Sequence, residues 1–188
     1  SLFSLGDVYS AQKQYAIAIN HYTSSLKILQ NVGHRELEAE ALRRWGDAYY
    51  GLEEYEDAVE IYKRAIQIFS EVGNTDKAEQ VRNKQNNAEK QIFLYQINIY
   101  EDLGQEYLDQ QKYQEAVNYY KQILKLRRRI GEPGTKVENA CNLANAYYLW
   151  GQQCYNDNKY ENAVQQLKKA LRIRRVLDDR KGQAETLL

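Results

Sequence analysis

The chain has 188 residues, 43% of them hydrophobic and 28% charged, which fits a folded protein and excludes a disordered one. Its 26 basic and 26 acidic residues cancel, so no global field draws it to nucleic acid or to an anionic membrane. A single proline and abundant helix-forming residues predict helices and no sheet. Because no signal peptide and no run of about 18 apolar residues appears, we expect a cytoplasmic protein without a membrane span.

Two cysteines, Cys141 and Cys154, fall on one predicted helix. Thirteen residues separate them, which is about 20 Å along a helix axis and too far for a disulfide. Neither has the spacing to His or other Cys residues that a zinc site needs. We therefore expect reduced thiols and no metal site.

One pattern of residues occurs four times. Each copy starts with a large residue followed by glycine, at Leu5-Gly6, Trp45-Gly46, Leu103-Gly104 and Trp150-Gly151. The residues 3, 9, 12, 16 and 20 positions after the glycine are Tyr9, Tyr15, Ala18, Tyr22 and Leu26; Tyr49, Tyr55, Ala58, Tyr62 and Ile66; Tyr107, Tyr113, Ala116, Tyr120 and Leu124; and Cys154, Tyr160, Ala163, Leu167 and Leu171.

This spacing predicts two short antiparallel helices per copy, A and B, packed face to face. The glycines and alanines permit close approach of the two helices, the glycine from helix A and the alanine from the other side, while the tyrosines fill the remaining space. Polar segments at 12–14, 53–54, 111–112 and 156–159 predict the turns between the helices.

These motifs resemble the tetratricopeptide repeat, in the roughly 40-residue form found in many bacterial regulatory proteins, kinesin light chains and G-protein-signalling modulators. The resemblance implies an all-α fold, a right-handed α-solenoid of antiparallel helix pairs. Units are expected at about 1–33, 34–73, 74–131 and 135–178, with a fifth pair starting at 179–188, in a single array. Because the sequence lacks an initial Met and stops within a predicted helix, we expect a fragment of a longer chain.

The ends of helix B are predicted at Val32-Gly33 and Val72-Gly73, and in unit four Asp178 replaces this glycine. Glu132-Pro133-Gly134 predicts a stop, and Thr135-Lys136-Val137-Glu138 has the form of a capping box that starts the next helix.

Two insertions lengthen the region before helix A. The glycine-to-glycine distances are 40, 58 and 47 residues, so units three and four carry 18 and 7 extra residues. These lengths are ~5.0 and ~1.9 helical turns and keep the same face towards the core. We therefore expect one long helix over 75–111, unless it breaks near Asn86-Asn87 into two separate arrays. Each extension has two possible roles: it covers the preceding unit, or it forms a contact surface. In the second case, the chain would self-associate through the long helix before Gly104.

Catalytic constellations are missing from the sequence. The two histidines, His21 and His34, have no Ser or Cys nucleophile at a suitable spacing. There is no phosphate-binding glycine loop. We expect no enzyme activity and no cofactor.

The family resemblance implies a concave groove lined by helix A, on the face turned away from helix B. By helical periodicity the predicted lining is Glu40, Arg43, Asp47 and Tyr50 in unit two, Asn98, Glu101, Gln105 and Leu108 in unit three, and Asn145, Tyr148, Gln152 and Tyr155 in unit four, with Phe3, Asp7 and Ser10 in unit one. This mixture suits a peptide or protein partner. Chaperone-binding relatives hold a carboxylate with a Lys/Asn/Arg clamp at these positions; the pairs here are Phe3/Asp7, Arg43/Asp47, Glu101/Gln105 and Tyr148/Gln152, which form no clamp.

A second candidate surface is basic. Basic residues stand at the same offsets after Gly104 and after Gly151 and form one column on each of two B helices. The first column is Lys121, Lys125 and Arg128, and the second is Lys168, Arg172 and Arg175. Arg127 and Arg174 extend them. They are either solvated cations near helix C-termini or contacts for an acidic protein, an RNA or a membrane surface.

The main hypothesis is thus a protein-interaction module in a regulatory or scaffold protein. The alternative is an anion or nucleic-acid binding solenoid, with nucleic acid the less favoured ligand.

Overall fold

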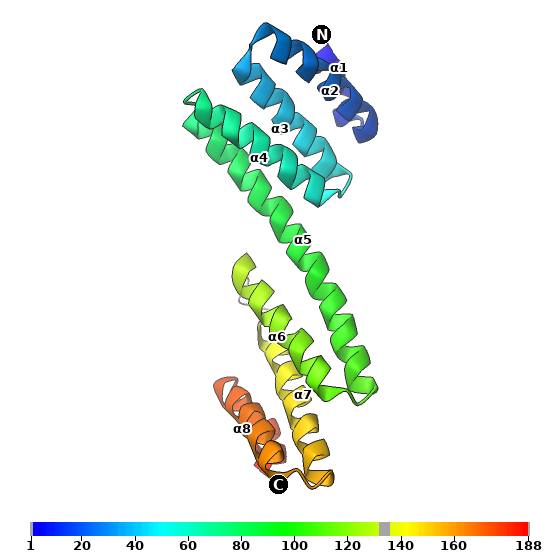
Figure 1. Ribbon diagram of the computed structural model, residues 1–188, viewed down its shortest axis with the longest axis vertical. Coiled ribbons are helices and arrows are strands. Elements are labelled where there is room, and N and C mark those ends of the chain that lie inside the picture. Colours follow the sequence, from blue (N-terminus) through cyan, green and yellow to red (C-terminus); the bar gives the residue numbers. More distant parts are fainter. Residues whose placement is uncertain (1, 132–135, 188) are drawn as a thin grey trace. The chain divides into compact units, whose positions relative to one another are not determined.

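The computed structural model describes residues 2–131 and 136–187. Its helices are α1 (Leu2–Ala11), α2 (Tyr15–Val32), α3 (Arg35–Gly51), α4 (Tyr55–Glu71), α5 (Thr75–Asp109), α6 (Tyr113–Ile130), α7 (Lys136–Asn156), α8 (Tyr160–Val176) and α9 (Arg180–Leu187) (Figure 1). No strand occurs among the described residues, which confirms the predicted all-α class. None of these helices combines the length and apolar character needed to cross a membrane.

The chain divides into two compact units, Ser1–Ile92 and Phe93–Leu188. The first contains α1 to α4 and the first half of α5, and the second contains the rest of α5 and α6 to α9. In both units the helices follow one another in antiparallel pairs, as α3 and α4 do in Figure 1. The single array over 1–188 stays a prediction.

Each unit has its own core. In the first, Leu42 of α3 and Tyr62 and Phe69 of α4 are almost fully buried, and Val81 of α5 packs on them. In the second, the buried residues come from α5 to α8 and include Ile97, Tyr120, Ile123, Tyr147 and Ala170.

At the crossings of helix A and helix B, a tyrosine ring lies over Gly6, Gly46 and Gly104, and the side chain of Leu167 lies over Gly151. A Cβ placed on Gly46 would stand 2.6 Å from Cε1 of Tyr62, and one on Gly6 2.5 Å from Cε1 of Tyr22. Ala18 and Ala58 are fully buried, but the group that fills the space above each glycine is the ring four residues later. The predicted glycine–alanine crossing is thus corrected to a glycine–tyrosine crossing.

The long helix α5 continues without a break through Asn86 and Asn87, as one of the two sequence alternatives predicts. Its first half supplies Ala78, Val81 and Ala88 to the core of the first unit. Its second half supplies Ile97 to the core of the second. One helix therefore serves as helix A twice, once in each unit.

Backbone conformations with positive φ end the helices. Gly33, Gly73 and Gly131 have φ of 76°, 78° and 70°, and Asp178 adopts the same left-handed region with φ 52°. The turns between helices A and B place Lys13, Glu53, Gln111 and Asn158 there as well. These positions match the predicted turns. The stop and the capping box predicted at 132–138 start at residues outside the described part of the chain.

Replacing Gly46 by Ala should destabilise the first unit. Helix propensity alone favours Ala by about 1 kcal/mol, but the new Cβ would clash with the buried Tyr62 ring, and such overpacking costs about 1–3 kcal/mol. We expect a net loss of about 1–2 kcal/mol in the free energy of unfolding, measured with urea. Gly104→Ala is the matched control, because its Cβ would stay 3.0 Å from Tyr120 and should cost less. A gain in stability for Gly46→Ala would contradict this packing.

Replacing Glu53 by Gly should stabilise the protein. Glu53 has φ 63°, which costs a residue with a side chain about 1–2 kcal/mol, whereas glycine adopts this region freely. After the entropy of the unfolded chain is included, we expect a gain of about 0.5–1 kcal/mol in thermal or urea unfolding. The neighbouring Glu54, with φ −83°, gives the control, and Glu54→Gly should bring no gain.

Candidate functional site

A polar cleft of about 670 Å³ lies in the first unit, between α1, α3 and the first half of α5. It is lined by Asp7, Ser10, Ala11, Tyr15, Tyr22, Arg43, Arg44, Asp47, Tyr50, Tyr62, Lys84 and Asn87. Five of the predicted groove residues therefore meet in one place, namely Asp7, Ser10, Arg43, Asp47 and Tyr50.

Helix phase explains why these residues converge. Asp7 and Asp47 directly follow the glycines of α1 and α3, and Asn87 is the equivalent residue of α5, because it stands 18 residues before Gln105, about five whole turns. Sequence analysis missed Lys84 and Asn87 because it counted only from Gly104. The five-turn length of the insertion was the signal that could have located Asn87, whereas Lys84 corresponds to Asp102, which is not one of the predicted groove positions.

Carboxylates hold the cations of the cleft. Asp47 accepts hydrogen bonds from Arg43 at 2.7 Å, from the hydroxyl of Tyr62 at 2.7 Å and from Lys84 at 2.9 Å. Asp7 pairs with Arg44 at 2.5 Å. The cleft therefore offers paired charges of both signs and little net field.

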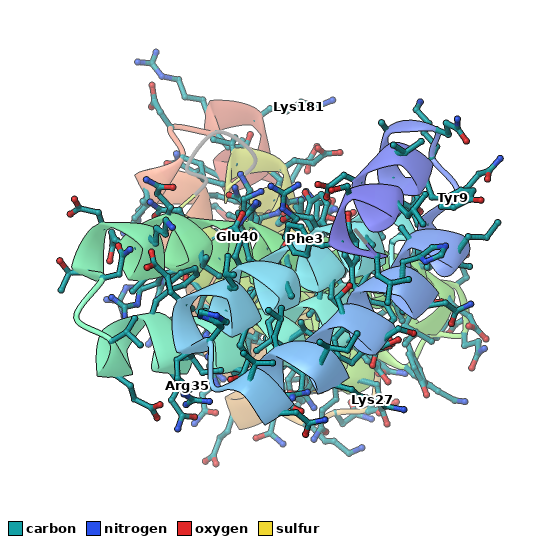
Figure 2. The ribbon with its side chains drawn as sticks, turned by 90° about the horizontal axis from the view of Figure 1, so that it is seen from above. Phe3, Tyr9, Lys27, Arg35, Glu40 and Lys181 are labelled. Atoms are coloured by element: carbon teal, nitrogen blue, oxygen red, sulfur yellow. The ribbon has the colours of Figure 1, made fainter. Side chains whose placement is uncertain are left out.

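The predicted groove residue Glu40 belongs to the same network beside the cleft. It accepts bonds from Arg43 at 2.6 Å and Arg44 at 3.3 Å, and Arg44 in turn stacks over the ring of Phe3. Figure 2 labels Glu40 and Phe3, the two residues that Arg44 contacts here. Burial raises the pKa of Glu40, but the two arginines outweigh it and hold that pKa below its usual range. Glu40 thus stays ionised and fixes both arginines.

Lys84 and Asn87, two residue types of a carboxylate clamp, lie in the cleft with Arg43 and were not among the pairs named from the sequence. Lys84 and Arg43 are both paired with Asp47, whereas the exposed amide of Asn87 makes no hydrogen bond within the described residues.

Two buried tyrosine hydroxyls line the cleft. Tyr22 donates to Asp7 at 2.9 Å, and burial together with this bond and the carboxylate charge raises the pKa of Tyr22 to about 12. Burial and Asp47 raise the pKa of Tyr62 in the same way. Both rings also cover the crossing glycines, so the cleft and the helix packing share these residues.

In the second unit, the predicted groove residues of α5 are partly used in structural contacts. Glu101 accepts a hydrogen bond from Asn139 at 2.7 Å and lies 3.6 Å from Arg127. Leu108 packs against the core, Gln105 bonds to Asp109, and Asn98 is exposed.

The predicted groove residues of α7 differ in their exposure and in the contacts that they make within the chain. Gln152 donates to the hydroxyl of Tyr148 at 2.6 Å, and the guanidinium of Arg174 covers the Tyr148 ring at 5.0 Å. Tyr155 is 62% exposed and makes an edge contact with Tyr160, and Asn145 is also exposed. Of the two tyrosines singled out from the sequence, Tyr155 offers a free ring and Tyr148 does not.

All six residues of the basic columns, from Lys121 to Arg175, are exposed. Their predicted extension by Arg127 and Arg174 is wrong, because these two side chains are buried. Arg127 lies near Glu101, and Arg174 donates to the carbonyl of Gly182 at 2.5 Å. Both arginines stabilise packing between helices.

Metal binding finds no support in the described part of the chain, where no cluster of three or more His, Cys, Asp or Glu side chains could hold an ion. Cys141 and Cys154 are free thiols on α7, the first exposed and the second buried.

The Tyr22 hydroxyl should make stability depend on alkaline pH. An unfolded tyrosine has a pKa of about 10. Because the folded pKa is raised to about 12, the stabilisation is fully present below pH ~10 and is lost as the pH rises through ~12. Urea unfolding between pH 8 and 12 should show this loss, and Tyr22→Phe should weaken it while costing about 1 kcal/mol at neutral pH. The exposed Tyr95 provides the control, since Tyr95→Phe should leave the profile unchanged.

Family models for the tetratricopeptide repeat match residues 1–71, 97–130 and 144–176. No curated protein matches the chain. Among solved structures, BtubC (BKLC) from P. vanneervenii is 18% identical with a TM-score of 0.37, over 94% of this chain and 63% of that one. Apo RapI is 18% identical with a TM-score of 0.36, over 98% and 58%. The TPR2AB domain of yeast Sti1, in a pHSP90 complex, is 13% identical with a TM-score of 0.31, over 98% and 94%.

The chain thus spans less than two thirds of the length of BtubC and RapI. The three matched segments coincide with the helix pairs α1–α4, α5–α6 and α7–α8, which carry the repeated glycine-to-tyrosine or glycine-to-leucine crossings. The chain belongs to the tetratricopeptide repeat family.

Proposed function

We propose that the chain is a protein–protein interaction module that binds a peptide or protein segment along the A-helix face, within a larger regulatory or scaffold protein. The observation that carries this proposal is the cleft of the first unit, where residues from three A helices converge. Repeats of this family serve interaction, and the partner is expected to be an extended or helical segment.

The chemistry of the cleft suits a polypeptide. A peptide backbone needs both donors and acceptors, and the cleft offers the free amide of Asn87, the hydroxyl of Ser10 and the carboxylate of Asp47. The rings of Tyr15 and Tyr50 supply apolar contact beside them. Because the charges are paired, a ligand with both polar and aromatic groups is favoured over a simple anion.

The second unit adds a separate aromatic contact. The rings of Tyr155 and Tyr160 lie 5.6 Å apart and are 62% and 55% exposed, so covering them with a partner would remove apolar surface from water. Such rings are frequent anchors in interfaces. We propose that Tyr155, with Asn145 and Gln152 on the same helix, contacts a partner segment.

Peptide selection tests the proposal directly. A phage library of random peptides would be selected on the purified chain, and the affinities of the selected peptides measured by calorimetry. We expect Asn87→Ala to weaken binding in the first unit about tenfold, and Tyr155→Ala to weaken binding in the second by ~1–3 kcal/mol. Arg172→Glu, on helix B, should leave both affinities nearly unchanged.

Melting temperatures of all variants must be recorded, because a loss of fold would mimic a loss of binding. The proposal fails if Asn87→Ala and Tyr155→Ala bind the peptides as the parent chain does while Arg172→Glu abolishes binding in a folded protein. In that case the functional face is the basic one.

A further inference from the structure

The four B helices differ sharply in charge. Helix α2 carries one basic and no acidic side chain, and α4 carries two basic and four acidic ones. Helices α6 and α8 each carry five basic side chains and one acidic. Since all four have the same place in the repeat, the fold itself does not require the excess of cations on α6 and α8.

Helix ends do not account for this excess. Basic residues in the last turn would complement the helix dipole, yet α2 and α4 have none there and form equally well. Core packing uses only Arg127 and Arg174. The remaining cations on the two columns, Lys121, Lys125, Arg128, Lys168, Arg172 and Arg175, are exposed and form no ion pair within the described residues.

Helices α6 and α8 present cations to the same point of the second unit. Lys121 of α6 and Lys169 of α8 lie 5.6 Å and 5.3 Å from the ring centre of Tyr147 on α7. The basic surface therefore covers both helices, and we call it the basic face. Tyr147 is only 5% exposed, so this ring is not available for a nucleotide base to stack on.

The first unit carries an acidic counterpart. The turn between α3 and α4 and the start of α4 expose five carboxylates, Glu53, Glu54, Glu56, Asp57 and Glu60. None of them forms an ion pair among the described residues, whereas most other carboxylates of the unit do. We call this set the acidic turn. It spans eight residues of sequence, as does each basic column, which is helical and therefore about 10 Å long.

We propose that the basic face of the second unit binds the acidic turn of a second copy of this chain. Charge complementarity selects this occupant, since both surfaces lack partners and the whole chain has a formal net charge of zero, so two copies do not repel each other at long range. The contact joins two different surfaces, so every pair of molecules still has one free basic face and one free acidic turn. It therefore generates rings or open chains of molecules rather than a closed symmetric dimer.

Sedimentation velocity measures this association. At about 50 mM salt, the weight-average sedimentation coefficient of the purified chain should rise with concentration up to about 200 µM, and at about 500 mM salt it should fall back to the monomer value. The double variant Lys168→Glu/Arg172→Glu and the double variant Glu56→Lys/Asp57→Lys should each weaken association at least about tenfold. Lys27→Glu on α2, outside both surfaces, is the matched control and should associate as the parent chain does.

Mixing the two double variants gives the decisive result. Each variant alone has only weakened pairs of surfaces, but the mixture contains one unaltered pair of surfaces and one pair in which the changed charges are again opposite. Association should therefore return on mixing, to within about threefold of the parent chain. Circular dichroism melting of each variant establishes that the fold is kept.

Three results would overturn the proposal. The first is a monomer at all concentrations in low salt, and the second is no recovery when the two folded variants are mixed. The third is tight, salt-sensitive binding of a 20-nucleotide oligo(dT) or of phosphatidylserine vesicles that Lys168→Glu/Arg172→Glu abolishes while self-association stays undetectable. That outcome would assign the basic face to a nucleic acid or a membrane instead.

Discussion

The contact between a glycine of helix A and a ring of helix B is the constraint on which the rest of the structure depends. It brings the two helices so close that a single Cβ on Gly46 would overlap the ring of Tyr62. The same close approach puts the hydroxyl of that ring within 2.7 Å of Asp47, the residue after the glycine. Packing and cleft chemistry are therefore set by one residue pair, and neither can change without the other.

This coupling differs between the two units. In the first, Tyr22 and Tyr62 each donate to an aspartate that also holds an arginine. In the second, Gln105 and Gln152 stand at the aspartate positions, and Leu167 replaces the tyrosine of the last crossing. The second unit keeps the packing but loses the buried tyrosine–carboxylate bond, so its A-helix face is free to use Tyr155 and neutral side chains.

Sequence periodicity predicted the helix pairs, their turns and the glycines that end helix B, because these depend on local chemistry and on spacing within one repeat. It did not settle whether the chain breaks near Asn86, since two asparagines weaken a helix but packing on both sides can sustain it. It also counted Arg127 and Arg174 with the exposed cations, because an offset on a helix does not show whether polar groups of a neighbouring helix cover the side chain. Asn87 was missed for a related reason. The groove positions of α5 were counted only from Gly104, near the end of the helix, and Asn87 lies five turns earlier on the same face.

The divergence of charge among the B helices follows from this division of roles. The A helices carry the crossing glycines and the cleft, so their faces are fixed on both sides. The B helices use one face for the crossing, at Tyr62, Tyr120 and Leu167, and the opposite face is free to vary. On α4 that freedom yields an acidic surface, and on α6 and α8 a basic one. Stability places little demand on these exposed residues, so their charges can differ from one repeat to the next without a change of fold.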